Sequence, residues 1–537
     1  MNIRIAQINP IVGDISGNFE LIRETIISSP EHSIIIFPEL AITGYPPQDL
    51  LLDSKFINQA QDAIKSLKSN VQKKVAIIGL PRYYEKNLYN SAVIINNQKI
   101  LGYHDKVLLP TYDVFDEKRY FKSSNMIEPF EISLDGKVIK IGVQICEDLW
   151  DQNYDLSVSD ELIRKGAEMM INISASPYRK HVIDKRIKLC IDKAKHLKYY
   201  FIYCNMVGAQ DELVFDGRSF IINSNGKNKL LAKMFKQEIL DFNFNQASNN
   251  EDVQVSSNVS EEIFKALITG VRDYFSKTNF QKAVIGLSGG IDSALTAALV
   301  SEAIGPENVY GISMPSKFSS NHSKDDAHIL ADNLGINFET IPINNVFNEF
   351  LNHMDVFFKD TQIGLAEENL QARIRGNILM SIANKINGLV LNTGNKTELA
   401  LGYCTMYGDM CGALGVISDL NKIEVYDLAK WINSSKGKTI IPQNSIDKAP
   451  SAELRENQYD PFDYEIIAPL VDLIINDNME KQNLIDIGYN EETIDDILNK
   501  IYLSEYKRRQ APPGIKISNK AFGIGRRYPI VNKYKGS

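Results

Sequence analysis

The chain of 537 residues lacks any long, uninterrupted apolar segment. No run approaches the roughly 18 residues needed to cross a bilayer, and residues 1–8 are typical of a strand, not of the apolar core of a signal peptide. An excess of positive charge is missing too, because 59 basic and 67 acidic residues give a net charge of −8. These absences predict a protein that neither spans a membrane nor coats nucleic acid.

Cysteine and histidine are scarce and scattered along the chain. The five cysteines and seven histidines show no spacing typical of a metal site, so we assign no zinc. So few thiols in so long a chain suit a reducing compartment, where a cysteine can serve chemistry instead of a disulfide. Composition therefore predicts a large, soluble, cytoplasmic protein of at least two domains, and it says nothing about activity.

The pattern of predicted elements changes near the middle of the chain. In the first half, short β-branched segments alternate with amphipathic ones, which predicts an α/β sandwich. Residues 246–260 have the polar composition of a linker. From residue 283, strand–loop–helix units recur, as expected for a parallel, doubly wound sheet. We therefore predict two large α/β domains, residues 1–245 and 261–537.

The clearest motif in the second half lies between a predicted strand, 283–286, and a predicted helix, 294–300. Adjacent glycines let the backbone approach an anion, two serines add hydroxyl donors, and the helix start contributes partial positive charge. An aspartate repels phosphate unless a cation lies between them, so the motif implies Mg²⁺; a glycine-rich turn without a ligand is the alternative. The lysine of a Walker loop is missing. The motif reads Gly286-Leu287-Ser288-Gly289-Gly290-Ile291-Asp292-Ser293.

This octet resembles the pyrophosphate loop of the ATP pyrophosphatase superfamily, whose members adenylate a carboxylate or carbonyl and release pyrophosphate. Segments 367–376, 393–409 and 448–454 narrow the resemblance to the NAD synthetases, which amidate deamido-NAD. The similarity covers essentially all of residues 261–537 and implies a Rossmann-like domain.

Carried over by position, this resemblance assigns ligands to individual residues. Without it, Arg373 would be interpreted as part of a solvated helix face and Glu398 as an acid in a first helical turn. Met406 stands where the single-domain, ammonia-using members have a lysine, so their nicotinate contacts do not transfer directly. The resemblance assigns ATP to Gly286–Ser293, Thr393, Lys422 and Ser451, Mg²⁺ to Asp292 and Glu398, and deamido-NAD to Asn369, Arg373, Glu398 and Lys507.

The first half contains three chemically active residues: Glu39 and Cys146, each at the end of a predicted strand, and Lys106 in the segment 104–110. A thiol beside a carboxylate and an ammonium can attack an amide, because the carboxylate takes the thiol proton and the ammonium stabilises the oxyanion. Spacing alone favours a buried structural thiol at Cys146.

Family resemblance reverses that interpretation. Segments 37–40, 106–121 and 145–150 resemble the three catalytic motifs of the nitrilase superfamily, and 172–178 resembles a later one. The similarity covers roughly residues 1–245 and implies a nitrilase-like αββα sandwich. It makes Glu39, Lys106 and Cys146 catalytic, and similarity to glutamine-dependent members assigns glutamine to Tyr112, Ser174 and Lys180.

Together, the two resemblances predict a glutamine amidohydrolase fused to an ATP-dependent synthetase. Such a ligase hydrolyses glutamine, adenylates deamido-NAD and forms NAD, AMP and pyrophosphate. Because ammonia released to bulk water would largely be protonated, we expect an internal passage. The expected partners are these small molecules and further copies of the chain in a homo-oligomer, with no nucleic acid and no membrane.

Three alternatives to this prediction stay open. The front half is an inactive remnant on an ammonia-dependent synthetase, or the chain is another amidotransferase of the ATP pyrophosphatase type. The third is a pure binding or scaffold protein. This alternative requires that two complete catalytic sets occur in one chain by accident.

Overall fold

The computed structural model describes residues 2–244, 252–255, 258–359, 361–451, 453–455 and 458–534. Two compact units make up the chain, Met1–Asn258 and Val259–Ser537. The division falls inside the linker predicted at residues 246–260. Residues 246–251 and 256–257 of that segment lie outside the described residues. Helix α5 (Val259–Thr278) begins one residue before the predicted end of the linker. In the described part of the chain, no helix is both long and apolar enough to span a bilayer.

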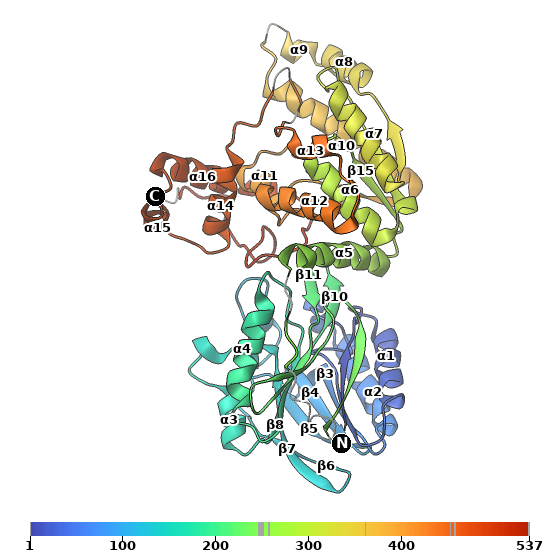
Figure 1. The fold of residues 1–537 in the computed structure, drawn as a ribbon, viewed down its shortest axis with the longest axis vertical. Helices are drawn as coiled ribbons and strands as arrows, with labels where there is room; N and C mark the ends of the chain where they lie inside the picture. The colour runs from blue at the N-terminus through green and yellow to red at the C-terminus, as the bar shows by residue number, and fades with distance from the viewer. Residues whose placement is uncertain are drawn as a thin grey trace. The chain divides into compact units, whose positions relative to one another are not determined.

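The first unit contains two six-stranded sheets, with helices on their outer faces (Figure 1). The first sheet has the order β14-β1-β2-β3-β4-β5 and the second β13-β12-β9-β8-β7-β6. The first consists of β1 (Asn2–Gln7), β2 (Ser33–Ile36), β3 (Val75–Tyr84), β4 (Asn87–Asn96), β5 (Lys99–Asp105) and β14 (Glu238–Asn243). The second consists of β6 (Phe130–Leu134), β7 (Lys137–Ile145), β8 (Met169–Ser174), β9 (Tyr200–Asn205), β12 (Phe220–Asn223) and β13 (Asn228–Leu231).

Side-chain alternation along the strands separates the layers of this unit. In β2, Ile34 and Ile36 join an apolar cluster that contains Ile171 of the opposite sheet, while Ile35 joins the cluster under the helices. A strand buried on both faces is expected to be apolar throughout, as β2 is apart from its first residue. The prediction of an αββα sandwich is therefore confirmed. The covering helices are α1 (Ile15–Ile27) and α2 (Ser54–Leu67) on the first sheet, and α3 (Val158–Arg164) and α4 (Val182–Ala194) on the second.

The second unit is built on a five-stranded, parallel sheet in the order β17-β16-β15-β18-β19. The central strand β15 comes first in the sequence, so the order reverses between β15 and β18, which is where doubly wound sheets bind ligands. This confirms the predicted fold class. The strands are β15 (Lys282–Gly286), β16 (Val309–Ser313), β17 (Asn337–Thr340), β18 (Gly388–Asn392) and β19 (Leu414–Gly415).

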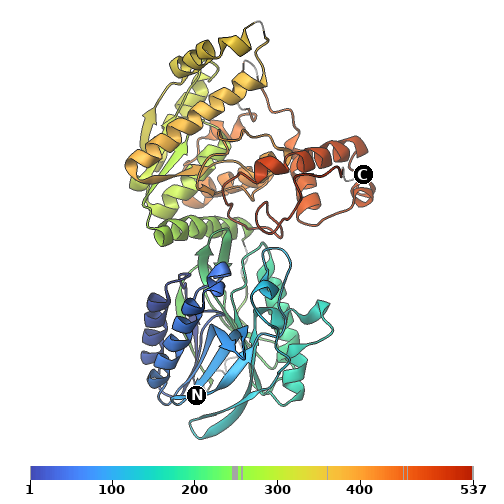
Figure 2. The same cartoon turned by 180° about the vertical axis from the view of Figure 1, so that it is seen from behind.

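Helices cover both faces of this sheet. Figure 1 shows α5 and α6 in front, and Figure 2 shows α10 crossing the opposite side. Helix α10 packs on β15 and β18 through an apolar cluster that includes Val284, Leu379 and Val390. These helices are α6 (Ile291–Ile304), α7 (Asn321–Leu334), α8 (Asn344–His353), α9 (Asp355–Phe358), α10 (Leu365–Ile386) and α12 (Lys422–Lys436).

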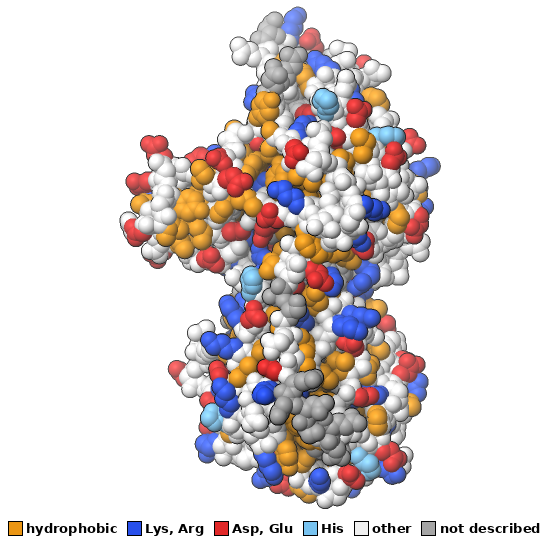
Figure 3. Space-filling view, in the orientation of Figure 1, with side chains coloured by type: hydrophobic (Ala, Val, Ile, Leu, Met, Phe, Trp, Pro, Cys, Tyr) orange, Lys and Arg blue, Asp and Glu red, His pale blue; other side chains and the backbone are white. Residues whose placement is uncertain are grey.

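A small helical lobe completes the second unit. Its apolar cluster joins the end of α11, at Ala400 and Leu401, to the helices between residues 464 and 503. Arg508, near the C-terminus, packs against this lobe: it is buried, donates to the carbonyls of Leu399 and Ala400, and pairs with Glu505. On the face in Figure 3, acidic and basic side chains are interspersed over both units. The lobe contains α11 (Lys396–Leu401), α14 (Tyr464–Ile475), α15 (Lys481–Asp486), α16 (Glu491–Leu503) and α17 (Glu505–Arg508). Helix α13 (Gln443–Asp447) packs instead on α6, α7 and α12.

Candidate active sites

The three predicted catalytic residues of the first unit lie just beyond the ends of strands. Glu39 follows β2, Lys106 follows β5 and Cys146 follows β7. All three side chains are buried, and Cys146 has a left-handed backbone with φ of 45°. The ammonium of Lys106 lies 2.7 Å from Oε1 of Glu39. The fold thus brings together residues that are up to 107 positions apart in the chain.

A second carboxylate, Glu117, completes the charge balance around Lys106. Its Oε1 lies 2.8 Å from the Lys106 ammonium and also accepts from the hydroxyl of Tyr45 at 3.2 Å. Glu117 lies within segment 106–121, to which the sequence analysis gave a family resemblance but in which it assigned no role to this residue. The signal that reveals it is geometric, since a buried lysine holds two carboxylates at once.

Glu39 is oriented by the groups around its two oxygens. The side-chain amide of Asn90 donates to Oε1 at 2.8 Å, and the backbone N–H of Ala175 donates to Oε2 at 3.0 Å. A carboxylate fixed in this way can take up a proton in one defined direction.

Burial controls the electrostatics of this site. Burial and the Glu39 carboxylate raise the pKa of the Cys146 thiol well above its usual value, and Lys106 only partly opposes them. Burial also raises the pKa of Glu117 to about 7 against the opposing effect of Lys106. For Lys106 itself, burial lowers the pKa, but Glu117 and Glu39 outweigh it and the net pKa is raised. The resting thiol is therefore protonated and needs a base before it can attack.

Of the predicted glutamine-binding residues, Tyr112 contacts the residue that follows Cys146. The hydroxyl of Tyr112 donates to the carboxylate of Glu147, the residue after Cys146, at 3.0 Å, and Tyr154 donates to the same carboxylate at 3.0 Å. Ser174 ends β8 and is buried. Lys180 is half-buried in the loop before α4. Sequence reasoning did not single out Glu147, which is itself buried.

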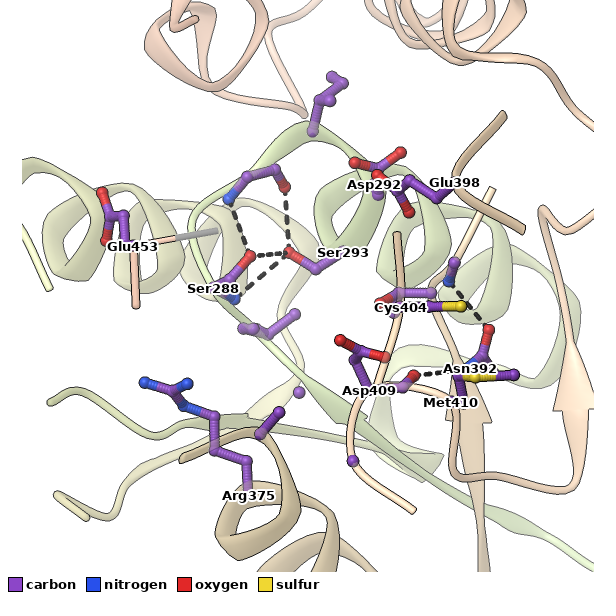
Figure 4. Close-up of a pocket in the computed structure, with 18 of the residues that line it drawn as sticks. Ser288, Asp292, Ser293, Arg375, Asn392, Glu398, Cys404, Asp409, Met410 and Glu453 are labelled. Atoms are coloured by element: carbon purple, nitrogen blue, oxygen red, sulfur yellow. Dashed lines mark hydrogen bonds between the residues drawn. The ribbon is translucent and has the colours of Figure 1, made fainter. Parts of the chain in front are cut away.

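In the second unit, the predicted phosphate loop connects β15 to α6 at the carboxyl end of the sheet (Figure 4). The loop is closed by its own serines: Gly290 N–H donates to Ser288 Oγ at 3.2 Å, and Ser293 Oγ donates to the Gly290 carbonyl at 3.0 Å. Gly289 has φ of 79°, and a Cβ there would lie 2.3 Å from the carbonyl oxygen of Ser323. Only glycine fits this position.

A cavity of about 320 Å³ opens over this loop, within the size range of small-molecule sites. Except for Gly289, every residue of the octet lines it. The predicted ATP ligands from distant segments line the same cavity, which brings four parts of the chain to one place. These residues are Thr393, Lys422 and Ser451, together with Glu398.

Asp292 and Glu398 lie next to each other at one end of this cavity (Figure 4), and the Lys422 ammonium contacts both carboxylates. Lys422 Nζ lies 2.5 Å from Asp292 and 3.4 Å from Glu398. Burial and the Asp292 charge raise the pKa of Glu398 to about 8, and Lys422 opposes them. Asn395, which caps α11, donates to the other oxygen of Asp292 at 2.9 Å.

This pair of carboxylates fits a magnesium ion that is shared with a nucleotide. Among the described residues no cluster of three or more His, Cys, Asp or Glu side chains is arranged for a metal. Mg²⁺ usually takes only one or two protein carboxylates and completes its shell with phosphate and water. Asp292 and Glu398 meet that requirement, and a dedicated protein cage is not needed.

Three of the predicted deamido-NAD residues gather around one turn instead of lining the ATP cavity. Lys507 Nζ donates to the carbonyls of Gly402 at 2.7 Å and Cys404 at 2.8 Å. Asn369 accepts from Thr405 Oγ1 at 2.7 Å, and the Arg373 guanidinium lies 3.3 Å from the Met406 carbonyl. The fourth residue, Glu398, lines the ATP cavity itself.

Comparison with known proteins agrees with these two sites. The family model described as carbon-nitrogen hydrolase matches residues 2–245, and the one described as NAD synthase matches residues 263–511. The glutamine-dependent NAD(+) synthetase of a Synechocystis species is 41% identical over 558 residues and covers 99% of each chain. That of Thermotoga maritima is 38% identical over 582 residues, covering 100% of this chain and 99% of its own.

A solved structure shows the same arrangement. The glutamine-dependent NAD+ synthetase of Acinetobacter baumannii, in complex with adenosine diphosphate, is 34% identical, with a TM-score of 0.78 and coverage of 100% of this chain and 99% of that one.

The fold and the two sites define a carbon–nitrogen ligase in which an amidohydrolase of the nitrilase type supplies a synthetase of the ATP pyrophosphatase type. More particularly, the chain belongs to the glutamine-dependent NAD(+) synthetases. It is a ligase that makes NAD with glutamine as the nitrogen donor.

Proposed function

We propose that Cys146 is the nucleophile that releases ammonia from glutamine. Glu39 takes the thiol proton as Sγ attacks the carboxamide carbon, and it returns that proton to the departing ammonia. The observation that carries this assignment is the buried Lys106 held by two carboxylates beside a buried thiol. Water then hydrolyses the thioester to glutamate with Glu39 as the base.

Lys106 stabilises the oxyanion that forms at the carboxamide carbon. Its raised pKa keeps it charged throughout the cycle, and its contacts with Glu39 and Glu117 fix its position. A fixed cation in a buried site lowers the energy of a developing negative charge without reorganisation.

Glu147 is suited to the charged end of the substrate. Its buried carboxylate follows Cys146 directly and is held by Tyr112 and Tyr154. Glutamine carries an α-ammonium group, which would pair with this carboxylate and orient the carboxamide toward the thiol. Ser174 and Lys180 complete the proposed glutamine site.

In the second unit, we propose that the loop Gly286–Ser293 holds the phosphates of ATP. An oxygen of the nicotinate carboxylate of deamido-NAD attacks the α-phosphorus, and pyrophosphate leaves. Ammonia then attacks the acyl adenylate, which gives NAD and AMP. A relative was solved in complex with adenosine diphosphate, which supports an adenine nucleotide as ligand. The separate contacts of Asn369, Arg373 and Lys507 with the turn at 402–406 support a dinucleotide near that turn.

Asp292 and Glu398 would hold the Mg²⁺ that accompanies ATP. When bound, Mg²⁺ supplies positive charge that offsets the phosphates and favours attack at phosphorus. Lys422 lies beside these two carboxylates and would contact the same phosphates; the carboxylates raise its pKa, so it is charged at neutral pH.

Rates of NAD formation with glutamine and with ammonium, on wild type and Cys146→Ala, test this proposal. We expect Cys146→Ala to lose the glutamine-driven reaction and to keep the ammonium-driven one. Retained glutamine-driven synthesis overturns the assignment of Cys146, and failure to release AMP with deamido-NAD as acceptor overturns the synthetase assignment. The predicted homo-oligomer is tested by light scattering on the full chain.

A further inference from the structure

Arg375 differs from the other cations that line the ATP cavity. Lys422 and Lys448 lie within 4.0 Å of carboxylates, and Lys324 is exposed on α7. Among the described residues, no carboxylate lies within that distance of the Arg375 guanidinium. The four cations of the cavity lining are Lys324, Arg375, Lys422 and Lys448.

Among the described residues, the guanidinium of Arg375 has one hydrogen-bond partner. Its Nε donates to the carbonyl of Met314 at 3.0 Å, and Arg375 lines the cavity from the side of the loop opposite Asp292 and Glu398 (Figure 4). Burial lowers the pKa of Arg375 to about 10, against the attraction of Glu453 and Asp409, so the group is charged at neutral pH. A poorly solvated charge without a close counter-ion is costly, and an anionic ligand removes that cost.

Packing fixes this side chain next to the phosphate loop. Leu379, one turn along α10, and Met314 both border Gly286, because a Cβ on that glycine would lie 3.3 and 3.4 Å from their side chains. The neighbouring Gly376 packs directly on the turn that follows α11, since a Cβ there would lie 2.8 Å from the carbonyl oxygen of Tyr407. Helix α10 therefore presents Arg375 to the loop from a rigid position.

The two carboxylates that attract Arg375 electrostatically, Glu453 and Asp409, have closer partners of their own. Glu453 is 2.5 Å from the Lys448 ammonium and accepts from Ser323 at 2.7 Å. Asp409 accepts from the Thr405 N–H at 2.7 Å.

We propose that Arg375 binds the triphosphate chain of ATP, on the side of the loop opposite Asp292 and Glu398. This inference rests on the proposed ATP site. A planar guanidinium with free amino groups matches two phosphate oxygens at once, whereas an uncharged adenine or ribose would leave its charge uncompensated. The same contact would stabilise the charge on pyrophosphate as it leaves.

Three variants isolate this role. Arg375→Met removes the charge and keeps most of the apolar stem, while Arg375→Lys keeps the charge and loses the two-donor geometry. Lys385→Met is the matched control, because Lys385 is an exposed cation on the same helix outside the cavity lining.

Calorimetric titration of the full chain with ATP, inorganic pyrophosphate and adenosine, in the presence of Mg²⁺, measures the effect. We expect Arg375→Met to weaken binding of ATP and of pyrophosphate by about 10- to 100-fold and to leave adenosine unchanged. Arg375→Lys should show an intermediate loss for the two phosphate ligands, and Lys385→Met should match wild type. Circular dichroism checks folding, and if Arg375→Met does not fold, Arg375→Lys decides alone.

Two results overturn the inference. Equal affinity of the Arg375 variants and wild type for ATP and pyrophosphate shows that the guanidinium does not contact phosphate. An equal loss for adenosine and ATP shows that it contacts the nucleoside. By contrast, a wild-type chain that binds neither ATP nor pyrophosphate overturns the proposed ATP site itself.

Discussion

The ammonium of Lys422 lies 2.5 Å from a carboxylate oxygen of Asp292, although 130 residues separate them in the chain. Lys422 begins α12 and Asp292 lies in the first turn of α6. The contact links the predicted phosphate loop to helix α12, which follows the last strand of the sheet. The negative charge of Asp292 is therefore balanced by a residue outside the loop.

Replacing Lys422 with Met should slow NAD formation with glutamine and with ammonium alike. The variant removes a buried cation from the proposed phosphate site, and loss of one such stabilising group typically costs about 10²- to 10³-fold in rate. Lys430→Met, at an exposed position of the same helix, is the control and should keep the wild-type rate. Full activity of Lys422→Met with either donor would contradict the proposed role.

Removal of divalent cations should stop NAD formation, whichever nitrogen donor is supplied. Asp292 and Glu398 provide two carboxylates, which suits Mg²⁺ bound together with ATP. The measurement is the rate of AMP release in excess chelator and again after Mg²⁺ is restored. An undiminished rate in chelator would show that these carboxylates act without a metal.

Glu117→Gln should reduce the glutamine-driven rate and change its pH dependence. The substituted glutamine is uncharged, so Lys106 loses one of its two negatively charged partners. Groups that position a catalytic side chain typically contribute about 10- to 100-fold to the rate. The pKa of Glu117 is about 7, so below that pH the carboxyl takes up a proton and one ion pair with Lys106 is lost. The wild-type rate of glutamate formation should therefore fall as pH drops through about 7.

The variant should lack that particular fall, because its amide does not titrate. The ammonium-driven rate of Glu117→Gln, measured at one fixed pH, is the control and should equal that of wild type. A pH profile that is identical in both proteins would rule out Glu117 as the titrating group.

Arg186→Met should destabilise the first unit. Arg186 is fully buried, lies 2.7 and 2.9 Å from the two oxygens of Asp216, and also donates to the carbonyl of Ser176. Removing one partner of a buried ion pair costs about 3–5 kcal/mol, because the other charge is left uncompensated. Denaturant unfolding of the full chain measures this loss.

The double variant Arg186→Met/Asp216→Asn separates charge from packing. If the unpaired carboxylate causes the loss, the second change should restore part of the stability. A double variant as unstable as Arg186→Met would place the cost in packing against Tyr203, whose ring lies 5.9 Å from the guanidinium carbon.

Much of the fold was predictable because local patterns encode it. The apolar segment of β2 and the strand–loop–helix units after residue 283 follow from side-chain periodicity, and the Gly289 turn follows from a backbone that only glycine adopts. The division between the units was harder to place, because a polar segment marks a linker without marking the residue at which the next helix begins.

By itself, the sequence determined which chemistry-bearing residues are present: a thiol and a carboxylate at strand ends, a lysine, and a glycine-rich loop before a helix. It could not determine which partners they have, since Glu117, Glu147 and Arg375 gain their significance from residues distant in the chain. Only the tertiary structure places Glu117 on Lys106, gathers Asn369, Arg373 and Lys507 around one turn, and leaves Arg375 without a close carboxylate among the described residues. The physical reason is that charge balance and burial depend on distances in space, and the folding of the sheets sets those distances.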